Sequence, residues 1–359
     1  ISDLFINDIL EDGIICWIND NENILLKVIP NNRNIEPAKP DVPETPIIEE
    51  TYGKKSITRT YQNLMQNKHD EALFDHYFTS QLVLLNTTNG KIKKIGEPSI
   101  FNEIYSSPNN EYLLIERIHR PYSYLLPYYR FPKDFEVWTF DGKLVNALHS
   151  RPLQDEVPIG GTYTGPRKFM WQPLKSATLI WVEALDEGNP KVVVDHRDKI
   201  MLLESPETEI AEEIFRTEHR FSRIDWSENK DELIYYEYDR DKIWKEGWLL
   251  EIGGKPKLVY DLSTRDKYSD PGKLVHKKTK YGRNVFIKSG DVVYYENNTG
   301  ATSEGNFPYL QKFNLVTKEK EILFRCKKDH YEIIQNFADD TLNKIIIRSE
   351  NQSNPPNYF

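Results

Sequence analysis

One short stretch of this 359-residue sequence concentrates side chains that could recognise a ligand. Residues 116–132 read ERIHRPYSYLLPYYRFP and hold three arginines, one histidine, four tyrosines and three prolines. A tight turn needs Gly, Asn or Asp rather than this much cationic and aromatic surface. Guanidinium groups are strong hydrogen-bond donors, and tyrosines combine an apolar ring with a polar tip. This loop is therefore the first candidate binding segment.

No motif for independent catalysis accompanies the loop. The sequence lacks G-x-S-x-G, the phosphate-binding G-x-x-x-x-G-K and the zinc-binding H-E-x-x-H. The S-x-x-K match at 227–230 lies in a predicted hairpin turn, where we interpret it as chance. The run HDEALFDH (69–76) could hold a metal ion, but a solvated face of an amphipathic helix is the preferred interpretation. We predict no catalytic residue, no metal and no cofactor.

Composition narrows the class of protein. The net charge is −9, which argues against a nucleic-acid groove, because phosphate binding needs a basic stripe. No apolar run approaches the roughly 20 residues that span a bilayer. Two cysteines are too few for a disulfide framework. An aromatic content of 12% favours strands.

A repeated hairpin organises the chain. Each unit has a few apolar residues, a polar turn and a stronger apolar run, at 14–28, 104–118, 169–183, 224–238, 333–349 and, more weakly, 272–288. A second hairpin follows most units, at 80–96, 135–148, 247–262 and 309–324, with 199–204 as the best candidate in the third unit. Two hairpins make four antiparallel strands, so we predict an all-β chain of about six β-propeller blades. A large β-sandwich is the alternative.

Long connectors fall at one end of these predicted blades. If the four strands of a blade are counted outward from the propeller axis, the turns from first to second and from third to fourth strand lie on one face, and these turns are short. The connectors on the opposite face are long, at 30–79, 119–134, 150–167, 184–198 and 297–308. Loops this long are more often functional than structural. The insertion 30–79 starts Pro-rich and acidic, and its part 56–78 predicts a helix with Ser56 or Thr58 as N-cap.

Four tracts of the chain resemble a known family. They are DEALFDHYFTSQLVLL (70–85), IHRPYSYLLPYYRFPKDFEVWTFDG (118–142), YSDPG (268–272) and GATSEGNFPYLQKFNL (300–315). These tracts resemble the propeller domain of glutamyl endopeptidases, which are serine peptidases of the prolyl oligopeptidase superfamily. The resemblance runs essentially end to end.

The resemblance implies an enzyme of two domains, a β-propeller followed by an α/β-hydrolase with a Ser-Asp-His triad. Residues 1–359 would then be a propeller domain, expected to be a fragment, with 30–79 as an insertion within it. Its implied partners are the C-terminal hydrolase domain and a peptide substrate, and its implied role is to gate and select peptides. No triad residue is assigned here. We favour a bacterial periplasmic or secreted location, with the cytoplasm as the alternative.

The resemblance also suggests what the arginine loop binds. A family named for cleaving after Glu must bind a carboxylate, and arginine does so with two parallel hydrogen bonds. The candidate substrate-binding residues are Arg120, Arg117, Arg130, His119, Tyr122 and Tyr124. Arg120 is favoured because no acidic residue lies within three positions of it. The alternatives are structural ion pairs with Glu116 or Asp134, and a loop that only docks the hydrolase domain.

Two other functions stay open on the sequence. One is a free-standing propeller that recognises a protein or peptide through its long loops. The weaker one is a propeller glycosidase with paired carboxylates, although nothing in the sequence shows which carboxylates would pair.

Overall fold

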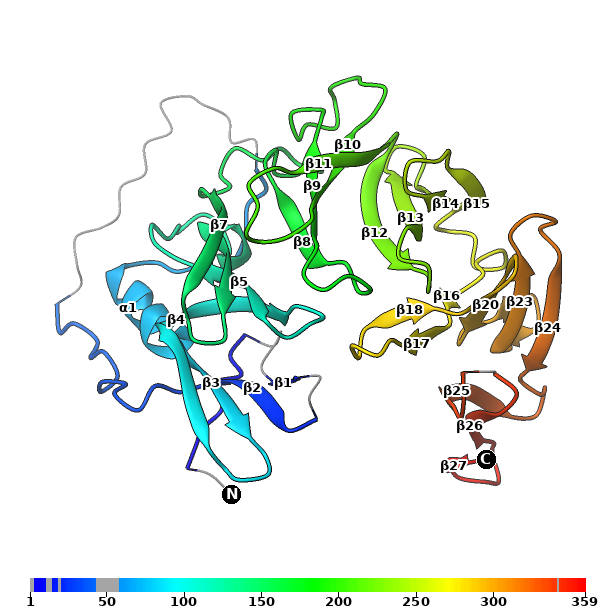
Figure 1. Ribbon diagram of the computed structural model, residues 1–359, viewed down its shortest axis with the longest axis horizontal. Coiled ribbons are helices and arrows are strands. Elements are labelled where there is room, and N and C mark those ends of the chain that lie inside the picture. Colours follow the sequence, from blue (N-terminus) through cyan, green and yellow to red (C-terminus); the bar gives the residue numbers. More distant parts are fainter. Residues whose placement is uncertain (1–2, 11–14, 19–20, 43–57, 341) are drawn as a thin grey trace. The chain divides into compact units, whose positions relative to one another are not determined.

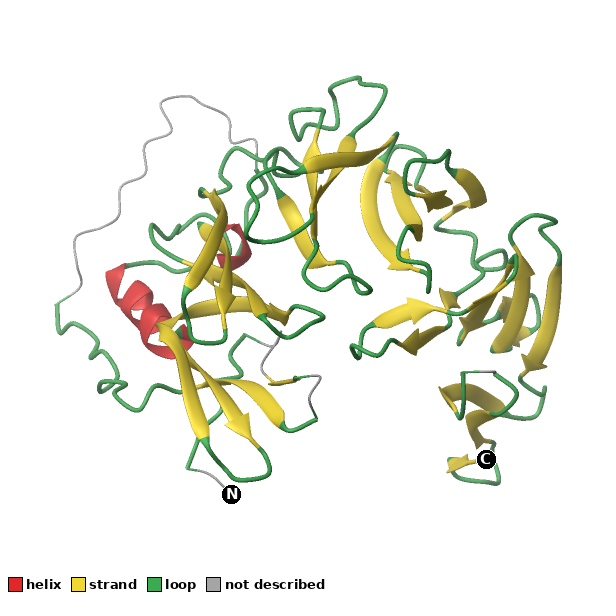
Figure 2. Cartoon of the chain, in the orientation of Figure 1, coloured by secondary structure: helices red, strands yellow, loops and turns green. Residues whose placement is uncertain are grey.

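The fold is described here from a computed structural model, in which residues 3–10, 15–18, 21–42, 58–340 and 342–359 are placed well enough to describe (Figure 1). The chain forms two compact units, Ile1–Glu213 and Ile214–Phe359, and each is treated by itself. Strands dominate both units (Figure 2). The expected class, all-β with four-stranded antiparallel propeller blades and a helical insertion, is confirmed.

Seven strands of the first unit form one antiparallel sheet in chain order. They are β1 (Ile15–Trp17), β2 (Asn23–Val28), β3 (Ser80–Asn86), β4 (Ile92–Ser106), β5 (Tyr112–Ile118), β6 (Lys133–Thr139) and β7 (Leu144–Arg151). The long β4 pairs with β3 as far as Ser99 and with β5 from Ile100 onward. It therefore ends one blade and begins the next.

The core of these two blades follows from the apolar runs in the sequence. Leu82, Ile95, Leu113 and Ile115 are completely buried in one cluster. Burial of a large aliphatic side chain contributes about 1.5–3 kcal/mol, so this cluster is a main source of stability for the unit. A further sheet has the order β11-β10-β9-β8. Its strands are β8 (Arg167–Trp171), β9 (Leu179–Ala184), β10 (Asp198–Leu203) and β11 (Glu212–Thr217).

In the described part of the second unit, three sheets have three or more strands. The first consists of β12 (Arg220–Trp226), β13 (Glu232–Asp239), β14 (Trp244–Glu251) and β15 (Lys257–Ser263). The second has the path β16 (Lys273–Leu274), β20 (Val292–Asn297), β23 (Tyr309–Asn314) and β24 (Lys320–Arg325), with β19 (Lys288–Ser289) beside β20. The third consists of β25 (Tyr331–Phe337), β26 (Ile345–Glu350) and β27 (Asn357–Tyr358).

The weak hairpin predicted at 272–288 is present as a small hairpin of β17 (His276–Lys278) and β18 (Asn284–Phe286). It stands apart from the main sheet of this blade, in which β16 pairs with β20, beyond the predicted range. Phe286 and Val293 are both buried in the same core cluster. A second small hairpin, β21 (Ala301–Thr302) with β22 (Gly305–Asn306), lies in the long connector after β20.

The predicted helix is shorter than expected. Helix α1 covers Lys68–Phe78, and its N-cap is Asn67, whose side chain accepts the backbone N–H of Asp70 at 3.0 Å. Thr58 is therefore not the cap, and Ser56 lies outside the described residues. Asn63 has a φ of 56°, a left-handed conformation that interrupts the apolar pattern read as helical. No helix in the described segments is long and apolar enough to cross a membrane.

Three long connectors of the first unit come together at one end of its strands. A core cluster joins Phe74 of α1 with Phe131 of the 119–134 loop, and Leu153 of the next connector packs against it. The backbone N–H of Gln154 donates to the carbonyl of Arg130 at 3.0 Å. The insertion, the arginine loop and the 150–167 connector are thus one packed layer.

Candidate functional site

Helix α1 holds the arginine loop through Arg120. The guanidinium pairs with Asp75 at 2.6 Å between Nη2 and Oδ2, and its Nη1 pairs with Glu71. It also lies 4.7 Å above the ring of Tyr122. The hydrogen bonds to Asp75 and Glu71 raise the pKa of Arg120 above its ordinary value. Arg120 has no acidic neighbour close in sequence, and its two acidic partners come from helix α1, about 45 to 50 positions earlier in the chain.

The two tyrosines of the predicted site reinforce this contact. The hydroxyl of Tyr122 donates to Asp75, and that of Tyr124 donates to Glu71 at 2.6 Å. Burial opposes ionisation of Glu71, but hydrogen bonds from Tyr124 and Arg120 outweigh it and lower the pKa of this carboxyl. Burial, followed by the hydrogen bond to Asp75, raises the pKa of Tyr122. We call Arg120, Tyr122, Tyr124, Glu71 and Asp75 the helix latch.

The remaining candidates divide into paired and unpaired groups. Arg117 donates from Nη2 and Nε to Glu136 at 2.7 and 2.9 Å, with Asp134 at 3.4 Å, so it does form a structural ion pair, but not with Glu116 as the alternative expected. His119 lies 3.4 Å from Asp134. In the part of the chain that the structure describes, Arg130 makes no ion pair. A role of these side chains in binding substrate stays a prediction.

One cavity of about 790 Å³ lies in the second unit. Its lining comes from β12 to β16, β20 and the connectors 264–272 and 297–306. The tract YSDPG supplies Asp270 and Gly272, and the tract GATSEGN supplies Ala301 and Asn306. Two of the tracts that carry the family resemblance are therefore walls of one cavity, which we call the tract cavity.

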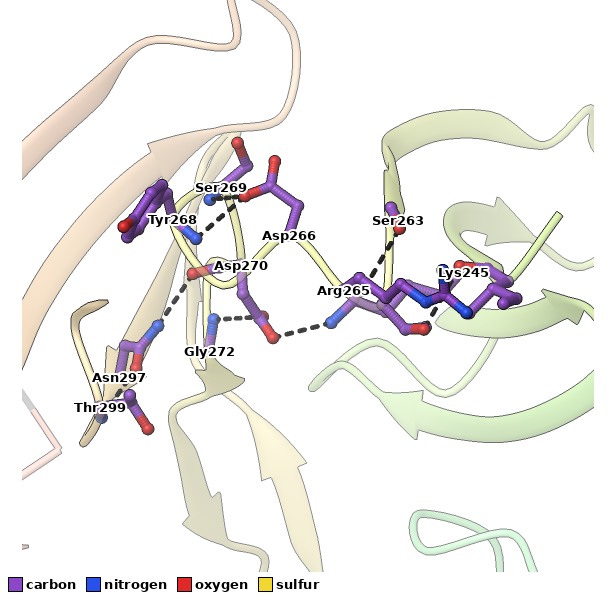
Figure 3. A network of polar contacts seen from close by, with 12 residues as sticks. Lys245, Ser263, Arg265, Asp266, Tyr268, Ser269, Asp270, Gly272, Asn297 and Thr299 are labelled. Atoms are coloured by element: carbon purple, nitrogen blue, oxygen red, sulfur yellow. Dashed lines mark hydrogen bonds and ion pairs between the residues drawn. The ribbon is translucent and has the colours of Figure 1, made fainter. Parts of the chain in front are cut away.

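A network of polar contacts fixes these walls (Figure 3). The backbone carbonyl of Asp270 accepts Asn297 Nδ2 at 2.8 Å and the hydroxyl of Tyr309 at 3.0 Å. One carboxylate oxygen of Asp270 accepts the N–H of Gly272 at 3.0 Å, and the other pairs with Lys245 at 3.1 Å. Asp266 accepts the N–H groups of Tyr268 and Ser269. These bonds hold both connectors in place around the cavity.

Two glycines are required for these walls. A Cβ on Gly272 would lie 2.1 Å from the carbonyl oxygen of Glu296, and one on Gly300 would lie 1.9 Å from that of Phe307. Both residues also have positive φ angles, +90° and +52°. The backbone at each position excludes a side chain by contact as well as by conformation.

Cations and tyrosines line the tract cavity. Arg223 lies 4.3 Å above the ring of Tyr236, and Lys245 lies 5.7 Å from the ring centre of Tyr260. Lys267 and Lys273 are exposed at the cavity and have no acidic partner within ion-pair distance among the described residues. Burial raises the pKa of Glu237 to about 7, and burial also raises the pKa of Glu296. Glu237 thus carries less negative charge near neutral pH than an exposed carboxylate.

No group of three or more His, Cys, Asp or Glu side chains suited to a metal ion occurs in the described segments. His69 and His76 both lie on α1, but Asp75 of the same helix is engaged in the helix latch. The helix therefore serves contacts with the arginine loop.

A cation missed by the sequence analysis is Arg151, the last residue of β7. It lies between the rings of Phe135 and Tyr163 and lines a second cavity of about 280 Å³ in the first unit. Its position at the start of the long 150–167 connector could have pointed to it from the sequence. In the structure Arg151 of β7 is paired with Lys133 of β6, which follows the arginine loop.

Comparison with known proteins finds two similar plant sequences. The chain is 34% identical over 99% of its length to a probable chloroplastic glutamyl endopeptidase of Oryza sativa subsp. japonica. It is 35% identical over 92% of its length to the protein of the same name in Arabidopsis thaliana. This chain is a homologue of the glutamyl endopeptidases. The resemblance to these proteins is confirmed over almost the whole chain.

The chain spans 40% of the rice protein and 35% of the Arabidopsis protein. No family model matches the chain. Among solved structures, an acylaminoacyl peptidase aligns with all of the chain and 43% of its own length, at a TM-score of 0.47 and 12% identity. The β-propeller domain of the Trilobed protease from Pyrococcus furiosus aligns with 79% of the chain and 71% of its own length, at 0.41 and 13%. These structural likenesses are too weak to carry an argument.

Proposed function

We propose that this chain admits and selects peptides for a serine endopeptidase active site carried elsewhere in a longer protein. Catalysis is assigned to an α/β-hydrolase domain, because no nucleophile motif lies in these 359 residues. The plant relatives support the proposal, because the chain matches well under half of each of them and both are named as endopeptidases.

The observation that carries the proposal is the tract cavity. Its volume of about 790 Å³ lies within the usual range of roughly 300–1,000 Å³ for ligand sites. Amide and hydroxyl side chains at its rim, such as Asn298, Asn306 and Thr299, can bond to a peptide backbone. The rigid walls lower the entropic cost of binding, because little of the site must be ordered when a peptide enters.

The charges of the cavity indicate the kind of peptide. Lys245 is paired with Asp270, whereas Lys267 and Lys273 make no ion pair among the described residues, although Lys273 lies opposite Glu296 across β16 and β20. Glu237 and Glu296, the other two acids at the lining, have raised pKa values. The cavity therefore attracts acidic peptides although the whole chain has a net charge of −9.

The test replaces two lysines of the tract cavity together, in the longer protein that carries both this chain and the proposed hydrolase domain. Lys267→Gln with Lys273→Gln should lower kcat/KM for an acidic peptide of about eight residues by roughly tenfold, since charged hydrogen bonds contribute about 1.5–3 kcal/mol. A single-residue Glu chromogenic substrate should be affected much less. The control is Lys257→Gln with Lys320→Gln, which removes the same two charges from exposed positions of β15 and β24.

Two results would contradict the proposal. Equal losses for the long and the single-residue substrate would mean that the lysines support the fold. Unchanged kinetics for the long peptide would mean that the cavity does not bind substrate.

A further inference from the structure

Glu237 of β13 is a buried carboxyl group in the wall of the tract cavity. The residue is 2% exposed and lines the cavity beside Tyr236 and Tyr238. One of its oxygens accepts the backbone N–H of His219 at 2.9 Å. A carboxyl group in this position is withdrawn from water, which favours its neutral form.

A second carboxyl group lies directly opposite Glu237 on the next strand. Glu246 of β14 is the register partner of Glu237, and Asp261 of β15 is the register partner of Glu246. Side chains opposed in this way have Cβ atoms about 4.5–5.5 Å apart, and like charges there destabilise a sheet. Three acidic residues thus form one row across the sheet, and Glu237 is its buried member.

The charged and titratable groups around Glu237 come from the ends of neighbouring strands. They are Glu218, His219 and Arg220 just before and at the start of β12, Asp239 at the end of β13, and Lys245 and Glu246 on β14. Arg220 and Lys245 lie opposite Tyr238, and side chains alternate along a strand, so these two cations belong to the other face of the sheet. On the face of Glu237 the neighbours are acids and one histidine, His219, whose Nε2 lies 3.9 Å from Glu246.

This environment stabilises a proton on Glu237. Burial raises the pKa of Glu237 to about 7, and the charges of Glu246 and Glu218 add to the shift, against the hydrogen bond from His219. The cavity wall therefore gains or loses one negative charge near neutral pH. Because Lys267 and Lys273 line the same cavity, its interior is more positive when Glu237 is neutral.

A buried hydroxyl in the same wall indicates that the cavity takes a ligand. Tyr236 is 5% exposed, and its hydroxyl has no partner at hydrogen-bond distance in the described part of the chain. A buried polar group without a partner is unfavourable, and a bound ligand would satisfy it. The charge of Glu237 therefore acts on a volume that is built for a ligand.

We propose that Glu237 and Glu246 form a proton switch, which makes the tract cavity bind anionic ligands tightly while Glu237 is protonated and weakly once it is ionised. The inference deepens the proposed function and rests on it for the identity of the ligand as an acidic peptide. Only a proton is exchanged with water, and no covalent bond to the ligand forms. Binding is tighter on the acid side of neutrality.

The experiment measures how two peptides of about eight residues, acetylated and amidated at their ends, bind to the 359-residue chain. One peptide alternates Glu and Ala, and the other has Gln in place of each Glu. Calorimetry at about pH 5.5 and about pH 8.5 leaves the Glu side chains of the peptide ionised in both cases, so a change in affinity reports on the chain. The acidic peptide should bind roughly three- to tenfold more tightly at the lower pH, since the wall charge acts through a reduced dielectric constant, and the Gln peptide should not change.

Three variants assign the pH dependence to the switch. Glu237→Gln should remove most of it, because the amide stays neutral and its oxygen can still accept the N–H of His219. Glu246→Gln removes the opposing charge, so the midpoint of the affinity change should move to lower pH, which a merely structural role would not cause. Glu251→Gln removes the same charge from the exposed end of β14 and should leave the midpoint unchanged.

The inference is overturned if Glu237→Gln keeps the full pH dependence, or if Glu246→Gln leaves the midpoint where it is. It is also overturned if the acidic peptide binds the chain equally at both pH values or at neither. Failure of the proposed function gives a different result. A longer protein that cleaves no peptide would contradict that function, whereas pH-dependent binding to the chain would still support the switch.

Discussion

At the scale of single residues, one guanidinium ties the arginine loop to helix α1. Arg120 reaches two carboxylates one helical turn apart, Glu71 and Asp75, and stacks on Tyr122. Its side chain is 50% exposed, so solvent screens each ion pair and its contribution to stability is modest. The latch therefore contributes more to the position of the loop than to the free energy of the whole fold.

Arg120→Ala should lower the free energy of unfolding by about 1 kcal/mol and increase amide hydrogen exchange along α1. Urea unfolding and exchange mass spectrometry measure the two effects. Arg130→Ala is the matched control and should change neither by much, because Arg130 makes no ion pair in the described part of the chain. Unchanged exchange in α1 for Arg120→Ala would show that the latch does not hold the helix.

Glu237 makes stability depend on pH. Its side chain is 2% exposed and accepts the backbone N–H of His219 at 2.9 Å. Burial raises its pKa to about 7 from an ordinary 4.5, and the charges of Glu246 and Glu218 add to this shift. The folded chain keeps this proton after the unfolded chain has released it. The stabilising contribution of the bound proton is therefore complete below pH 4.5 and lost as pH rises through about 7.

Glu237→Gln should remove this dependence, because the amide stays neutral and its oxygen can still accept the N–H of His219. At pH 8 the variant should be more stable than the parent chain by about 2 kcal/mol, and at pH 4.5 the difference should vanish. Urea unfolding at both pH values measures it. A difference that is equal at the two pH values would contradict the assignment of the pH effect to Glu237.

At the scale of elements, the connectors around the tract cavity depend on glycine. Gly300 combines a φ of +52° with a space that a Cβ could not enter, whereas Gly290 has a φ of +60° and no atom within 4 Å of a built Cβ. Substitution of these two glycines by alanine therefore distinguishes two losses of stability. Both variants lose the glycine-favoured backbone conformation, but only at Gly300 would the added Cβ also collide with other atoms.

Gly300→Ala should lower the free energy of unfolding by clearly more than Gly290→Ala, which should cost about 1 kcal/mol for its backbone conformation alone. Thermal or urea unfolding of the two variants provides the comparison. Equal losses would show that the 297–308 connector can move to admit a methyl group, and the tract cavity would then not have rigid walls.

The sequence predicted strands better than it predicted their ends and partners. Hairpins such as 224–238 were recognised because apolar runs flank polar turns, and β12 and β13 pair there. The start of α1 was misplaced because the apolar spacing continues before Asn67, although Asn67 and Asp70 carry the capping signal. The true partner of β16 was missed because an extra hairpin, β17–β18, intervenes.

The sequence indicated that arginines and tyrosines of the long connectors are the candidate binding groups. It did not show which of these arginines already have acidic partners in the fold. Arg120 was favoured because it has no acidic neighbours in sequence, yet its acidic partners lie on α1. Arg151 makes no ion pair within the part of the chain that the structure describes, a property that depends on how β6, β7 and the 150–167 connector pack. Pairing across about 45 residues is a tertiary property that local sequence does not show.

At the scale of the whole molecule, the chain is a set of propeller blades with binding features and no catalytic motif. The family-like tracts include parts of the helix latch, the arginine loop and the walls of the tract cavity. Three of them also run through the strands β3, β6 and β23, so these tracts serve the fold as well as the long connectors.

The account is tested most directly by locating the reactive serine of the longer protein. A serine-directed fluorophosphonate is reacted with that protein and with the 359-residue chain, and the adduct is mapped by mass spectrometry. The account predicts one inactivating adduct on a serine outside these residues and no labelling of the chain alone. An adduct on any serine within the printed sequence, or a longer protein that cleaves acidic peptides without being labelled, would contradict it.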